Sequence, residues 1–138
     1  MPVSYRIDRD NGTIHTRCLG RVTFDEVAGH LRALTQDPDC PNRLDVLLDV
    51  TQASSAPTSE QLRAFSNLIA GIRDTVRFDG CAIAACTDVL FGMSRMFEVL
   101  AQECFQETHV FRSVDKAEEW LVARRQPAKC MTAGAGFP

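Results

Sequence analysis

The sequence lacks the ligand spacings that metal centres and disulfide frameworks use. Its six cysteines contain no C-x-x-C pair, and His15, His30 and His109 are too far apart in the chain to suggest a shared ion. We therefore expect no metal site, and thiols that stay free as in a reducing cytoplasm. Three of the cysteines are expected to be small core residues, namely Cys18, Cys81 and Cys86.

Targeting and membrane-spanning segments are also missing. The opening MPVSYRIDRDNG has Arg6 and Asp8 where a signal peptide needs an apolar core, and no apolar run approaches the ~20 residues that span a bilayer. The net charge of −3 gives no general attraction to nucleic acid or to an anionic membrane surface. We expect a cytoplasmic protein with no nucleic-acid partner and at most peripheral membrane contact.

The motifs of common enzymes are absent as well. The chain has no glycine-rich phosphate loop, no H-E-x-x-H and no G-x-S-x-G. Asp49 and Asp88 end two expected strands, but no histidine or lysine is placed to complete a site, and the first lysine is Lys116. Asp88 is better explained as the N-cap of the following helix. Because catalysis needs a convergent acid, base or nucleophile, we expect no enzyme activity and no cofactor.

The N-terminal segment of the chain has the pattern of a β-hairpin. The segment VSYRIDRD alternates apolar and polar residues, and TIHTRCL returns after Asn11-Gly12, a pair typical of type I′ turns. A two-residue turn there sets Asp8 opposite His15. The inward side chains are expected to be Val3, Tyr5, Ile7, Ile14, Thr16 and Cys18.

Helices then alternate with short apolar strands. Thr23 and Glu26 form a capping box at the first helix start, and Asp79-Gly80 is expected to turn into the strand CAIAAC. The expected elements after the hairpin are a helix over 24–34, a strand over 45–50, a helix after Pro57, a strand over 81–86, a helix over about 89–104, a strand over 108–111 and a helix after Ser113. The order β-β-α-β-α-β-α-β-α predicts a single α/β domain over residues 1–125, with a mixed, mostly parallel sheet of about five strands. Residues 126–138 lack any period, and we expect a disordered tail.

The hydroxyl-rich loop LLDVTQASSAPTSEQL has a structural and a functional interpretation. Thr58 with Gln61 forms a second capping box, which explains most of the cluster as a helix start. A phosphate on Ser59 would face the free N–H groups and positive end of that helix, although Glu60 would repel it. Ser59 and Thr58 are therefore the candidate phosphoacceptors.

The element order, the buried strand VLLDV and the helix DVLFGMSRMFEVLAQ resemble the SpoIIAA-like branch of the STAS fold over roughly residues 3–122. The resemblance implies a small cytoplasmic bacterial domain, related in shape to anti-sigma-factor antagonists and likened to CRAL-TRIO lipid carriers. In the antagonists an Asp-Ser-Ser-Gly motif carries the phosphorylated serine, and here it falls on Pro57–Glu60. Only the hydroxyls of Thr58 and Ser59 match, because proline replaces the acidic residue and glutamate replaces the glycine.

The third helix contributes most of a candidate ligand surface. Methionine and aromatic side chains suit a loosely specified nonpolar ligand, although the same residues are typical of core packing. Arg95 pairs with Glu98 or binds an anionic headgroup, and Phe91, offset from the apolar stripe, is exposed or meets a second subunit. The candidate ligand-binding residues are Phe65, Ile69, Phe91, Met93, Arg95, Met96 and Phe97.

Two functions are compatible with these observations. The first is a non-catalytic binding module that holds a nonpolar or amphipathic small molecule, or a lipid, between the sheet and the second and third helices. The alternative is a STAS-type regulatory switch that acts on a protein partner through the start of the second helix. Apolar helix faces in so small a chain are also compatible with a homodimer.

Overall fold

The computed structural model describes residues 3–38, 40, 43–72 and 75–125. The expected tail, 126–138, lies outside these residues. The elements are β1 (Val3–Asp8), β2 (Thr13–Gly20), α1 (Phe24–Thr35), β3 (Arg43–Ala53), α2 (Ser59–Ile72), β4 (Arg77–Ala84), α3 (Asp88–Leu100), β5 (Glu107–Phe111) and α4 (Val114–Arg125). Their order confirms the predicted α/β arrangement. In the part of the chain that the structure describes, no helix is long and apolar enough to cross a bilayer.

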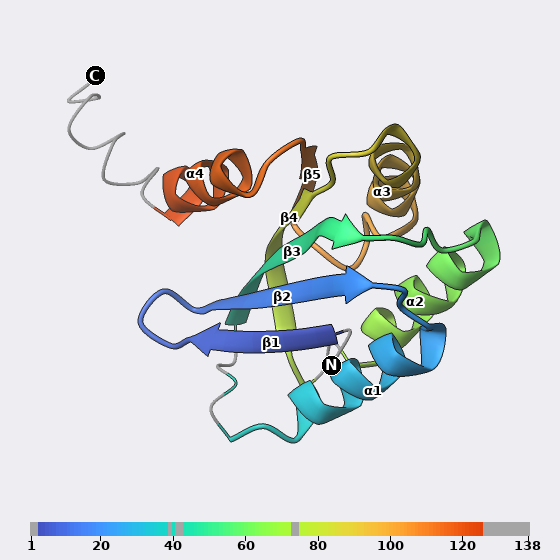
Figure 1. The fold of residues 1–138 in the computed structure, drawn as a ribbon. Helices are drawn as coiled ribbons and strands as arrows, with labels where there is room; N and C mark the ends of the chain where they lie inside the picture. Colours follow the sequence, from blue (N-terminus) through green and yellow to red (C-terminus); the bar gives the residue numbers. More distant parts are fainter. Residues whose placement is uncertain (1–2, 39, 41–42, 73–74, 126–138) are drawn as a thin grey trace.

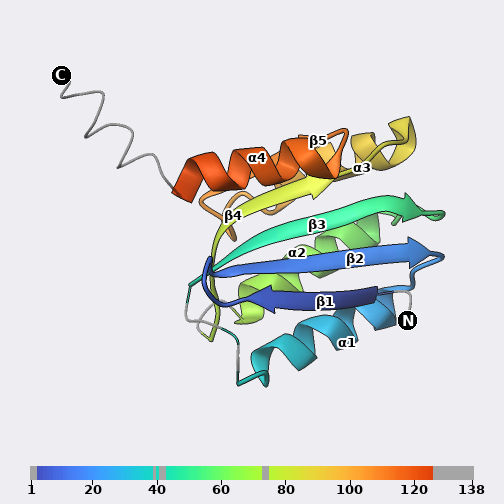
Figure 2. The same cartoon turned by 60° about the vertical axis from the view of Figure 1, so that its left-hand side comes forward.

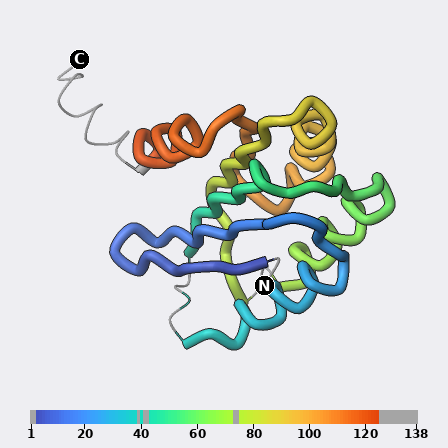
Figure 3. Tube along the Cα trace, in the orientation of Figure 1, coloured from blue at the N-terminus to red at the C-terminus, as the bar shows by residue number. Residues whose placement is uncertain are grey.

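The five strands form one mixed sheet in the order β1-β2-β3-β4-β5. Only β1 and β2 pair antiparallel, while β2–β3, β3–β4 and β4–β5 pair parallel. In Figure 3 the chain colour accordingly changes from blue to orange across the sheet, without a jump in strand order. Each parallel pair is joined through a helix, as parallel neighbours require.

The helices are divided unequally between the two faces of the sheet. Helices α1, α2 and α3 pack on one face, where the main hydrophobic core includes Ile14, Leu34 and Ile83. Helix α4 packs alone on the other face over β3, β4 and β5, and there Ala82 and Ala84 face Leu121. Figures 1 and 2 show α4 apart from the other three helices. The small side chains of β4 let α4 approach the sheet closely.

The hairpin register differs from the predicted one by two residues. Thr13 lies opposite Asp8, and His15 lies opposite Arg6. The Asp8 carboxylate accepts hydrogen bonds from the backbone and side-chain nitrogens of Asn11, at 3.3 and 2.7 Å, so the loop has four residues rather than two. Because the shift is even, the inward and outward faces stay as predicted.

The starts of β4 and α3 also differ from the prediction. Asp79 and Gly80 were expected to form a turn, but both are buried inside β4. Thr87, not Asp88, is the N-cap of α3, and its hydroxyl accepts a hydrogen bond from the N–H of Leu90 at 3.2 Å. The expected end near residue 104 is also wrong, because α3 ends at Leu100.

Candidate functional site

An apolar cavity of about 180 Å³ lies between the sheet and helices α1, α2 and α3. The sheet contributes, among others, Ile14, Val46, Leu48, Cys81 and Ile83 to its wall. The helices contribute, among others, Leu31, Leu62, Phe65, Ile69, Met93 and Phe97. A concave, mostly apolar surface with a few polar groups is typical of small-molecule sites.

The starts of α1 and α2 meet at one side of this cavity. Both helices begin with capping boxes, as predicted, because each N-cap threonine exchanges hydrogen bonds with the residue three positions on. The ring of Phe24, the first residue of α1, stacks on the ring of Phe65 in the middle of α2, with centroids 5.0 Å apart and planes 8° apart. Both rings line the cavity.

The structure separates the predicted ligand-binding residues into two groups. Four of them line the cavity, namely Phe65, Ile69, Met93 and Phe97. Met96 lies outside it with 42% of its surface exposed, so its expected place in the wall is wrong. Residues three apart lie about 60° apart around a helix, so Met96 falls at the edge of the face that Met93 shares with Phe97, and its side chain stays at the surface.

Phe91 and Arg95 also lie outside the cavity. The guanidinium of Arg112 sits 4.1 Å above the half-buried ring of Phe91. Arg95 pairs with Glu98 at 3.4 Å on the surface of α3. Neither side chain therefore supplies a polar group to the apolar cavity.

The cavity wall contains a polar pair that the sequence analysis did not propose as a site. Thr16 of β2 and His30 of α1 both line the cavity, and the Thr16 hydroxyl lies 3.2 Å from His30 Nε2. The ring of Tyr5 packs on the imidazole at 4.9 Å. Burial lowers the pKa of His30 below its ordinary value, so this imidazole is neutral at pH 7. The helical position of His30, one residue before Leu31, was the available clue.

The candidate phosphoacceptors have different surroundings. The Thr58 hydroxyl accepts a hydrogen bond from the N–H of Gln61 at 3.1 Å and is occupied as an N-cap. Ser59 is exposed at the first position of α2. Of the two, Ser59 therefore presents the more accessible hydroxyl.

The two carboxylates that were expected to end strands have nearby partners. Asp49 does not end a strand, because β3 continues to Ala53, and it accepts hydrogen bonds from the backbone N–H and the hydroxyl of Thr51 in the same strand, at 2.9 and 2.6 Å. Asp88, the first residue of α3, pairs with Arg112 at 3.0 Å.

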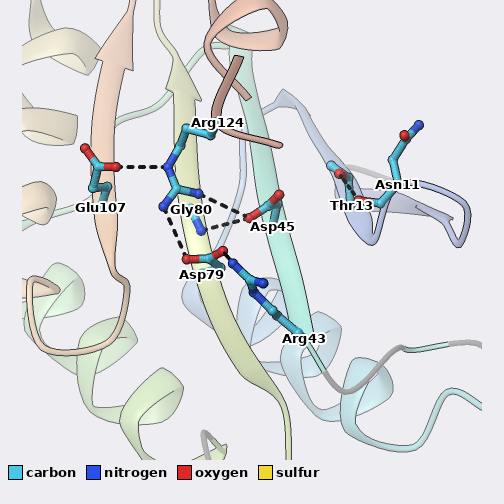
Figure 4. Close-up of polar contacts among 8 residues, drawn as sticks. All are labelled: Asn11, Thr13, Arg43, Asp45, Asp79, Gly80, Glu107 and Arg124. Carbon is cyan, nitrogen blue, oxygen red and sulfur yellow. Dashed lines mark hydrogen bonds and ion pairs between the residues drawn. The ribbon is translucent and has the colours of Figure 1, made fainter. Parts of the chain in front are cut away.

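A buried charge cluster on the other face of the sheet was missed by the sequence analysis. The guanidinium of Arg124 on α4 lies 3.6 Å from Asp45, 3.2 Å from Asp79 and 3.0 Å from Glu107 (Figure 4). Arg43 pairs with Asp79 from the opposite side. The cluster ties α4 to three strands.

Opposing effects act on the pKa of Asp79 in this cluster. Burial raises that pKa, but hydrogen bonds from Arg43 and Arg124 outweigh burial and bring it below its ordinary value. The carboxylate is therefore ionised and held by two cations. Since every charge in Figure 4 has a partner of opposite sign, we assign the cluster a structural role.

The thiols of Cys18, Cys81, Cys86 and Cys104 are not in disulfides. Cys18 and Cys81 are buried as predicted, and burial raises the pKa of Cys18 to about 11 and that of Cys81 further. Cys86 was expected in the core but is exposed, because β4 ends at Ala84. Within the described ranges, no three His, Cys, Asp or Glu side chains are grouped to hold a metal ion.

A hairpin followed by three strand–helix–strand crossovers, with the last helix alone on the far face, defines the chain as a protein of SpoIIAA-like fold. It is similar to the crystal structure of an uncharacterised protein of the DUF3478 family from Shewanella loihica, which has a SpoIIAA-like fold. The TM-score is 0.58 at 16% sequence identity, over 86% of this chain and 91% of that chain. No family model and no curated protein matches the sequence. The similarity confirms the predicted fold, and the function has to be inferred from the cavity.

Proposed function

We propose that the protein is a non-catalytic cytoplasmic binding module that holds a nonpolar or amphipathic small molecule between its sheet and helices α1–α3. The apolar cavity of about 180 Å³ is the observation that carries this proposal. It lies where side chains of three helices and four strands converge, and its wall is mostly aliphatic and aromatic. The driving force for binding would be removal of the ligand's apolar surface from water.

The apolar wall of the cavity supports the same proposal. Apolar side chains that line unfilled space lack part of the burial and of the dispersion contacts that a packed core provides. A ligand that fills the space of about 180 Å³ supplies those contacts, so an apolar ligand is favoured.

Two methionines of α3 provide a matched test. Met93 lines the cavity, whereas Met96, on the same helix, lies outside it and is exposed. We expect Met93→Trp to fill the cavity and Met96→Trp to leave it unchanged. The measurement is the ligand-induced rise in melting temperature, with toluene as the apolar probe and native mass spectrometry of the purified protein as a second readout. At a concentration of 100 Kd a bound probe stabilises the folded state by about 2.7 kcal/mol.

The expected result is a toluene-dependent shift in the wild-type protein and in Met96→Trp, and no shift in Met93→Trp. Circular dichroism establishes that Met93→Trp is folded, since overfilling a core typically costs about 1–3 kcal/mol. If toluene and medium-chain alcohols shift neither the wild-type protein nor Met96→Trp, the binding function is refuted.

The exposed hydroxyl of Ser59 favours a second candidate, a STAS-type switch that acts on a regulatory protein. A phosphate there would face the free N–H groups at the start of α2, next to Glu60, which also lies in the first turn. Intact-mass analysis of the protein from its native host tests this candidate. A phosphorylated fraction that disappears in Ser59→Ala and persists in Thr58→Ser supports it, whereas an unmodified mass under every growth condition, with no partner in pull-downs, excludes it.

A further inference from the structure

One polar part of the cavity wall is built from a strand, β2, and a helix, α1. Thr16 is 4% exposed and shares a 3.2 Å contact with His30 Nε2, while both residues line the cavity. The other ring nitrogen, Nδ1 of His30, has no hydrogen-bond partner among the described residues and is shielded from solvent. A buried imidazole nitrogen without a partner is unusual, because buried polar groups are nearly always paired.

The Thr16–His30 pair has hydrogen-bonding capacity that the protein itself does not use. A hydroxyl has one donor and two acceptor positions, and a neutral imidazole has one donor and one acceptor. Their mutual contact uses one donor and one acceptor, which leaves further positions on the pair. We propose that the cavity binds a small neutral amphiphile of about single-ring size, whose one hydrogen-bonding group contacts Thr16 and His30.

The surroundings of the pair favour a neutral ligand over an anion. Ile14, Leu31 and Leu34 line the same cavity, and a bare carboxylate among such side chains loses its hydration without gaining a cation. His30 does not supply that cation, because burial lowers its pKa. The desolvation of a neutral hydroxyl or carbonyl group costs much less free energy, and one hydrogen bond to the protein offsets most of that cost.

The cavity volume limits the size of the ligand. A dry cavity of about 150 Å³ lined by aliphatic and aromatic residues accommodates benzene in another protein. The space of about 180 Å³ found here therefore fits one ring with one or two small substituents. A long-chain lipid exceeds it.

Three probes of similar shape distinguish an apolar ligand, a ligand with a neutral polar group and an anionic ligand. They are toluene, 4-methylphenol and 4-methylbenzoate. In a purely apolar cavity the phenol binds much more weakly than toluene, because its hydroxyl loses water without compensation. We expect calorimetry on the wild-type protein to show 4-methylphenol binding at least as tightly as toluene, and 4-methylbenzoate binding at least tenfold more weakly than 4-methylphenol.

Variants of the polar pair then locate the contact. In His30→Leu we expect the affinity for 4-methylphenol to fall at least tenfold while that for toluene changes less than threefold. His30→Gln retains a donor and an acceptor and should recover part of the loss. Tyr5→Phe is the matched control, because Tyr5 packs on the imidazole but does not line the cavity.

The inference rests on the proposed binding function, and its failure is distinguishable from failure of that function. Ser94 of α3 is another buried polar residue of the cavity wall. If toluene binds but 4-methylphenol binds ten times more weakly, or if Ser94→Ala and not His30→Leu removes the preference, the polar contact is wrong and the cavity function stands. Tightest binding by 4-methylbenzoate overturns the neutral ligand class. If none of the three probes binds, the binding function itself fails.

Discussion

Arg124 provides the sharpest test of how α4 is held on the sheet. Its guanidinium is 18% exposed and lies within 3.6 Å of carboxylate oxygens on Asp45, Asp79 and Glu107. We expect Arg124→Leu to destabilise the protein strongly, because two of these carboxylates are buried and lose a cation. Leucine is a good helix former, so α4 itself keeps its helix propensity.

The magnitude follows from what remains around the two aspartates. Removing one partner of a buried ion pair typically costs about 3–5 kcal/mol. Here Arg43 still pairs with Asp79, and the N–H of Gly80 still donates to Asp45 at 2.9 Å. We therefore expect the free energy of unfolding to fall by about 2–3 kcal/mol. This loss is smaller than that for a buried charge left with no partner.

Urea denaturation at pH 7 is the measurement, followed by circular dichroism and by the fluorescence of the single tryptophan. That residue, Trp120, is on α4 with Arg124 5.3 Å from its ring centroid, so its emission reports docking of the helix. Lys116→Leu is the matched control on the same helix. Its pair with Glu119 is exposed and separated by 3.9 Å, so we expect a change of about 0–0.5 kcal/mol.

The pH dependence gives the prediction a second, independent check. The pKa of Asp79 is lowered in the folded protein, so its contribution to stability is present above the ordinary value of 3.8 and is lost as the pH falls through the folded pKa. The stability difference between wild type and Arg124→Leu should therefore shrink below about pH 4. A loss no larger than that of Lys116→Leu, or a difference that does not change with acid, would refute the reasoning.

Gly80 offers a steric test of the same cluster. A Cβ added there would lie 2.5 Å from Arg124 Nη1, so Gly80→Ala must displace the guanidinium without removing any charge. We expect a smaller loss than for Arg124→Leu, because the end of an arginine side chain is flexible. Additive losses in the double variant would mean that the two residues do not interact.

The remaining predictions concern single groups. A hydrogen bond to Asp37, helped by burial, raises the pKa of Tyr5, the single tyrosine, to about 12, so its absorbance at 295 nm should titrate near pH 12 and move toward 10 in Asp37→Asn. The associated stability is present below pH 10 and lost as the pH rises toward 12; a midpoint near 10 in the wild-type protein contradicts this account. Thr87→Ala should cost about 1 kcal/mol in urea denaturation through loss of the α3 N-cap, and an unchanged midpoint would contradict that role. Met96 and Val99 are 42% and 65% exposed on α3, and we propose a homodimer through this face; light scattering should show a dimer that Met96→Glu dissociates, and a wild-type monomer would exclude it.

Features determined by neighbours in the chain could be predicted well. The capping box of Thr23 and Glu26 depends on residues three apart, and the same spacing explains the start of α2 at Thr58. The alternation in the hairpin gave the correct buried face although the loop length was wrong, because an even shift in register preserves the side-chain direction. The separation of Met93 from Met96 was not available in this way, because residues three apart share one face of a helix and only the packing shows that Met96 lies outside the cavity.

By itself, the sequence determined the element order, the starts of α1 and α2 and the parallel sheet, because these depend on short-range spacing and on the crossover helices that parallel strands require. Only the tertiary structure decided that Asp79 lies inside β4, since its partner Arg124 is 45 residues away and sequence spacing carries no information about that contact. The cavity was decided in the same way. Its volume is what remains when side chains of seven elements fail to fill the space between them, and the polar pair of Thr16 and His30 exists only because β2 and α1 meet there.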